Sequence, residues 1–119
     1  MTPAKYLSLI VNFNYIDSPF HPLLKKIADM MVAQEDVVVG LHELIDIKYQ
    51  DQEECEAMKD KLNVIFLPSY QATRDVIAAI QENKVEKRII AISESLSLTM
   101  NKFNYEYGKL ATQVRDKQI

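Results

Sequence analysis

The sequence has few of the residues on which small-site chemistry depends. Its 119 residues include one cysteine, two glycines and two histidines. The lone Cys55 excludes an intrachain disulfide and a metal cluster built on cysteines. Neither of the common glycine-rich phosphate signatures, GxGxxG or GxxxxGK[ST], occurs. The sequence therefore predicts no metal site, no cofactor and no catalytic residue, and it favours a role other than catalysis.

An excess of basic residues is also missing. The net charge is −3, whereas binding to nucleic acid or to an anionic membrane surface requires a basic face. The N-terminal apolar run carries one lysine and is interrupted by Ser8, Asn12 and Asn14, which is unlike a signal peptide or a membrane span. We therefore expect a cytoplasmic protein that binds neither nucleic acid nor membrane.

The composition is ordinary for one globular domain over residues 1–119, with 48% hydrophobic and 26% charged residues.

The stretch 63–93 predicts a strand–helix–strand unit. Val64–Leu67 is an apolar run that Pro68 would stop, residues 69–82 have helical spacing, and Lys87–Ile92 is rich in β-branched residues. A helical crossover of this length is typical of a parallel strand pair.

The rest of the chain extends this pattern. Residues 6–15 alternate as a strand does, although Thr2-Pro3 resembles a helix cap and leaves a helix open. Further elements follow in order: helix 20–34, β-prone runs 37–39 and 44–49 around Gly40, and helix 51–62. We expect an α/β fold with a small, mostly parallel sheet of four or five strands and helices on both faces. An all-helical bundle is the alternative.

The final segment, 94–117, predicts a long helix. Its apolar residues are separated by four, three, four, three and four positions, which is the heptad spacing; they are Leu96, Met100, Phe103, Tyr107, Leu110 and Val114. Such a helix would be ~36 Å long and would extend past a strand of ~17–20 Å. We therefore expect a non-catalytic interaction or regulatory module, a homo-oligomer or a binder of a protein partner through this helix. Packing of the stripe within the chain is the other interpretation.

A second hypothesis is a small ligand-binding domain or enzyme. In open α/β sheets, ligands bind beyond the carboxyl ends of the strands. That rule selects a polar set: Asn14, Asp17, Ser18, His21, Ser69, Tyr70, Ser93 and Ser95. Three of its serines are also placed as ordinary helix caps.

Parts of the chain resemble thioredoxin-like domains. The segment VNFNYIDSPFHPLLKKI resembles their first strand and helix, with residues 18–21 in place of the redox Cys-x-x-Cys. The run LIDIKY, the helix after it and Leu67-Pro68-Ser69 resemble the second strand, second helix and the proline before the third strand. The resemblance implies an alternative architecture without thiol–disulfide activity, because both cysteines are missing. It departs from the family at 70–82, which is helical where that fold has a hairpin.

Overall fold

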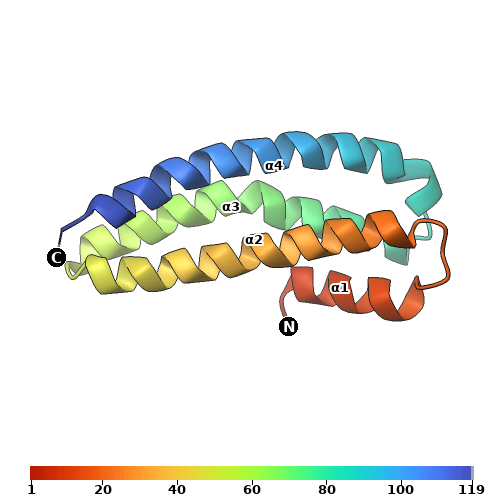
Figure 1. Ribbon diagram of the computed structural model, residues 1–119, viewed down its shortest axis with the longest axis horizontal. Coiled ribbons are helices and arrows are strands. Elements are labelled where there is room, and N and C mark those ends of the chain that lie inside the picture. Colours follow the sequence, from red (N-terminus) through yellow and green to blue (C-terminus); the bar gives the residue numbers. More distant parts are fainter. Residues whose placement is uncertain (119) are drawn as a thin grey trace.

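The computed structural model describes residues 1–118 and contains α-helices but no β-strand within them (Figure 1). The chain forms four helices in this part: α1 (Pro3–Asn14), α2 (His21–Lys48), α3 (Gln52–Gln81) and α4 (Val85–Asp116). The short connections around 49–51 and 82–84 turn the chain back on itself. As a result, α3 runs antiparallel to both α2 and α4 (Figure 1).

The three long helices make an elongated bundle. The whole molecule measures 51 × 25 × 19 Å, and its radius of gyration is 16.2 Å. A compact chain of this length would have a radius of gyration of ~13.5 Å. Helix α1 is less than half as long as the others and packs on α2 and α3 at one end of the bundle only (Figure 1).

The predicted α/β fold is wrong, and the thioredoxin-like alternative is wrong with it, because the described residues contain no sheet. The all-helical alternative was the right one. The alternation over 6–15 has a specific origin: Leu7 and Val11 are buried, whereas Leu9 and Phe13 are exposed on the other side of α1. Two apolar helical stripes therefore interleave along the sequence and imitate the two-residue period of a strand.

The expected strand–helix–strand unit at 63–93 is also wrong. Pro68 lies inside α3 rather than ending it, on the exposed side of the helix. An internal proline removes one backbone hydrogen bond, and the packing of the rest of this long helix offsets that loss. Lys87–Ile92 is the start of α4, which begins nine residues before Glu94.

The turn between α3 and α4 explains why the chain reverses where it does. Asn83 has φ = 57°, a left-handed conformation that asparagine tolerates better than most residues. The N–H of Asn83 donates to the carbonyl of Ile80, and the N–H of Lys84 donates to the carbonyl of Ala79. This pattern is a Schellman motif, which satisfies the last carbonyls of α3.

The β-prone runs 37–39 and 44–49 lie within or at the end of α2. Ile45 is buried and Ile47 is exposed, so the second run again alternates without being a strand. Gly40 is an exposed helical residue rather than a bend between strands.

A polar layer divides the bundle core into two parts. One hydrophobic cluster contains residues of α1, of the start of α2, of the end of α3 and of the first half of α4. The other contains residues of the end of α2, of the start of α3 and of the second half of α4. Between them lie the buried side chains of Gln34, Ser69 and Thr73. The Gln34 amide donates to the Met100 sulfur and so joins α2 to α4 at this level.

Candidate functional site

The eight polar residues predicted to line a pocket do not meet in one place. Asn14 ends α1, Asp17 and Ser18 lie in the turn after it, and His21 begins α2. Ser18 Oγ accepts from the Phe20 N–H (3.1 Å), a local turn contact. These four share one end of the bundle.

The other four belong to the long helices. Ser69 and Tyr70 lie in the middle of α3, about 11 residues and therefore ~17 Å from its C-terminal end. Ser93 and Ser95 lie in the first third of α4. Tyr70 and Ser93 line two different surface depressions. Without strands, the reason for expecting these residues together is gone.

The apolar stripe of α4 faces the interior of this chain. Leu96, Phe103, Leu110 and Val114 are buried, and Met100 and Tyr107 are half-buried, all within a single copy. The Phe103 and Tyr107 rings stack with centroids 5.5 Å apart. The Tyr107 hydroxyl donates to the Val37 carbonyl of α2 (3.2 Å), and partial burial raises the pKa of Tyr107. The stripe thus holds α4 against α2 and α3.

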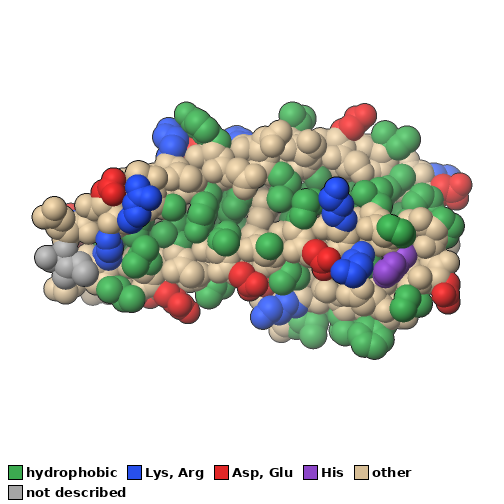
Figure 2. Space-filling view, in the orientation of Figure 1, with side chains coloured by type: hydrophobic (Ala, Val, Ile, Leu, Met, Phe, Trp, Pro, Cys, Tyr) green, Lys and Arg blue, Asp and Glu red, His purple; other side chains and the backbone are tan. Residues whose placement is uncertain are grey.

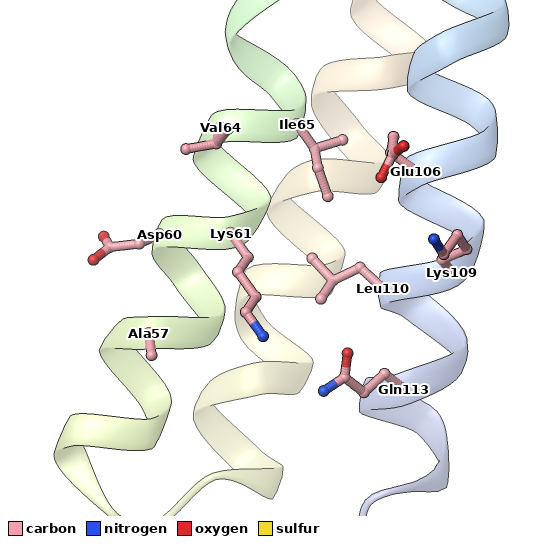
Figure 3. Close-up of a pocket in the computed structure, with 9 residues that line it drawn as sticks. All are labelled: Ala57, Asp60, Lys61, Val64, Ile65, Glu106, Lys109, Leu110 and Gln113. Atoms are coloured by element: carbon pink, nitrogen blue, oxygen red, sulfur yellow. The ribbon is translucent and has the colours of Figure 1, made fainter.

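A groove of about 540 Å³ runs between α3 and α4 (Figure 3). Ile65 and Leu110 point toward each other across it, and the Lys61 side chain lies along it (Figure 3). Its charged lining is balanced, with Asp60 and Lys61 on α3 and Glu106 and Lys109 on α4. No single sign of charge dominates, so the groove does not select a ligand by electrostatics.

A row of polar contacts crosses from α2 to α3 where α1 does not cover them. The His42 ring and the Asn63 amide oxygen are 3.0 Å apart, and Asp46 forms a salt bridge with Lys59. Lys59 holds the pKa of Asp46 below its ordinary value, and Asp46 raises the pKa of Lys59. These exposed contacts do not supply an active site.

Cys55 joins the same row, because its thiol donates to the Asp46 carboxylate (3.5 Å). Partial burial raises the pKa of Cys55, and the neighbouring carboxylate raises it further. A thiol with a raised pKa is a poor nucleophile at neutral pH, because little thiolate is present. Elsewhere in residues 1–118, no three side chains of His, Cys, Asp or Glu are grouped to hold a metal ion.

None of the helices in the described part of the chain combines the length and the apolar character needed to cross a membrane.

The outward face of α1, together with the turn that follows it, carries a regular exposed apolar pattern. Tyr6, Leu9, Phe13 and Ile16 are separated by three, four and three positions, and their exposed fractions are 38%, 42%, 75% and 61%. We call these four residues the α1 stripe. Figure 2 shows hydrophobic side chains gathered at the lower right, over α1. Within α1 itself the only charged residue is Lys5.

Sequence reasoning missed this surface. It assigned Leu9 and Phe13 to the same strand face as Leu7 and Val11, which the helix turns inward. The available signal was the three–four spacing of the exposed set together with Thr2, whose side chain does accept from the Lys5 N–H and caps α1.

Comparisons with protein-family models, with curated proteins and with solved structures give no significant match to this chain. The surfaces described above are therefore the basis for a function.

Proposed function

We propose that this protein is a non-catalytic association module that pairs with a second copy of itself through the α1 stripe. The observation that carries the proposal is the row of exposed apolar side chains: Tyr6, Leu9 and Phe13 lie on a helix with one charge, and Ile16 continues the row in the turn after it. A helix that is apolar on both sides is normally covered on both sides. Its inner side packs on α2 and α3, so a second copy would cover the outer side.

The exposed area is consistent with a reversible dimer. With ~200 Å² for a fully exposed large side chain, the four exposed fractions amount to ~430 Å² per copy. Two copies would bury ~860 Å² from these residues alone, and flanking residues add to this. Specific complexes bury about 1,200–2,000 Å², and weak, transient ones bury less. We therefore expect dissociation on dilution rather than an obligate dimer.

Charge favours an antiparallel pair. Lys5 lies in the first turn of α1, and Asp17 lies in the turn just after its end. An antiparallel arrangement brings the end with Lys5 beside the partner's end with Asp17. A parallel arrangement would place like charges together. In the antiparallel register, Leu9 of each copy meets Phe13 of the other, and Tyr6 meets Ile16, so the stripe is self-complementary.

Sedimentation equilibrium over a range of micromolar concentrations tests the proposal. The mass should rise from 13.7 kDa toward twice that value. Phe13→Glu should hold the protein at the monomer mass. Tyr105→Glu is the matched control, because Tyr105 is also an exposed aromatic residue but lies on α4. A wild-type protein that stays monomeric at the highest concentration would refute self-association.

The orientation has its own test. Lys5→Glu alone should weaken the dimer at low salt, and adding Asp17→Lys should restore it, because every reversed charge again meets its opposite. If the double variant is no better than Lys5→Glu, the antiparallel arrangement is wrong even where the dimer itself persists.

A further inference from the structure

A second surface lies between α2 and α4. In Figure 1, α3 runs between these two helices, and Figure 2 shows hydrophobic side chains gathered in the band that separates them. A cavity of about 360 Å³ opens there, bounded by the first turns of α2 and by residues 93–104 of α4. Small-molecule sites begin at about this size. We call it the α2–α4 groove.

The base of the groove is apolar and adaptable. The buried side chains of Ile27 and Leu96 line it, together with the half-buried Met30 and Met100. Methionine side chains are flexible and polarisable, so they can adjust to apolar ligands of varied shape. The base thus suits a hydrocarbon segment.

The rim is polar and carries one sign of charge. Ser93, Ser97, Asn101 and Asn104 line it from α4 as neutral hydrogen-bonding groups. Among the described residues that line the groove, Lys26 alone is charged. Its neighbour Lys25 pairs instead with Asp29 at 2.7 Å. The α2–α4 groove therefore offers one cationic group to a ligand and no carboxylate that would repel an anion, in contrast to the balanced α3–α4 groove.

An incompletely bonded amide contacts Met100, one of the two methionines that line the groove. Gln34 is 5% exposed, its NH2 group donates to the sulfur of Met100, and its Oε1 has no hydrogen-bond partner within residues 1–118. A thioether is a weak acceptor, so this contact does not hold Met100 firmly, and the flexible Met100 side chain can adjust to a ligand in the groove.

We propose that the α2–α4 groove binds an anionic amphiphile. Its hydrocarbon chain lies on Ile27, Met30, Leu96 and Met100, and its acidic head group lies at Lys26. The inference does not depend on pairing through α1, because α1 does not line this groove.

Laurate is the probe for the first test, by isothermal titration calorimetry below its micelle concentration. Wild-type protein should bind it saturably. Lys26→Gln should weaken laurate binding about tenfold, as expected for a charge-assisted contact, and should leave the uncharged-head probe dodecyl maltoside unaffected. Lys25→Gln is the matched control and should change neither. Ser97→Trp, on the exposed rim, should block both probes while circular dichroism stays unchanged.

The proposal is overturned if wild-type protein shows no saturable laurate binding, or if Lys26→Gln and Lys25→Gln behave alike. A vesicle arm separates the two sources of such a ligand. Co-sedimentation with phosphatidylglycerol vesicles that depends on Lys26 would assign the groove to a lipid head group. Laurate binding without such co-sedimentation would assign it to a free acyl carboxylate.

Discussion

Replacing Ser69 by alanine should make this protein more stable, although most core substitutions do the reverse. Ser69 is 1% exposed, and its Oγ has no hydrogen-bond partner among residues 1–118. Burying a hydroxyl without a partner costs ~1–3 kcal/mol relative to water. Alanine removes that cost, and it also has a helix propensity better than serine by up to ~0.5 kcal/mol.

The free-energy cost of the void that Ser69→Ala leaves in the core is small. Removing one oxygen atom leaves a void of roughly 10–15 Å³, which costs only ~0.3 kcal/mol at ~24 cal/mol per Å³. The net expectation is a gain of about 1–2 kcal/mol in the free energy of unfolding. For a chain of this size, that corresponds to a rise in melting temperature of about 4 °C for each kcal/mol.

Urea unfolding followed by far-ultraviolet circular dichroism measures this directly. The midpoint should rise while the slope m stays the same, because the surface exposed on unfolding hardly changes. Ser95→Ala is the matched control: Ser95 is an exposed helical serine, so it reports the propensity term alone. If Ser69→Ala stabilises the protein no more than Ser95→Ala does, the hydroxyl is not the unpaired group that the polar layer implies.

Three further predictions concern other parts of the chain. Leu110→Glu should abolish the helical circular dichroism signal rather than only change the oligomeric state, because it places an unpaired carboxylate in the core; Tyr105→Glu at an exposed site should leave the fold intact. Measured by NMR, the pKa of the Asp46 carboxyl should lie below the ordinary range of an aspartate, because Lys59 stabilises the carboxylate, and Lys59→Met should return the pKa toward that range. Because the folded pKa is lowered, the stabilising contribution of Asp46 is present above its unfolded pKa and is lost as the pH falls through the folded pKa. Cys55 should react with iodoacetamide more slowly than the same thiol in urea-unfolded protein, and Asp46→Asn should accelerate the reaction in the folded state; equal rates in wild type and variant would remove Asp46 from the account.

The fold was mispredicted where the same run of residues fits both a short strand and part of a long packed helix. Short β-branched runs such as Val64–Leu67 and Lys87–Ile92 favour strands in isolation. In the structure each run is part of a helix of 30 or more residues, α3 or α4, and packing on neighbouring helices outweighs the local preference. Pro68 was wrongly predicted to end a strand. It lies inside α3, because a long helix that packs on its neighbours tolerates an internal proline.

The candidate sites also differ in how far the sequence could predict them. The polar pocket depended on strand ends, so it was lost with the sheet. The α1 stripe depends on two apolar faces of one helix, which residues 6–15 encode but do not distinguish from alternation. The α2–α4 groove combines residues more than 60 positions apart, such as Ile27 and Leu96. No local pattern reports such a pairing.

The heptad spacing of the apolar residues in α4, the single cysteine and the lack of a glycine-rich phosphate signature can all be read from the order of residues. The fold was needed to show that the apolar face of α4 packs against α2 and α3 of the same chain and that the α1 stripe is exposed. A heptad pattern identifies the apolar face of a helix, but the arrangement of the other helices in space determines which side chains pack against that face.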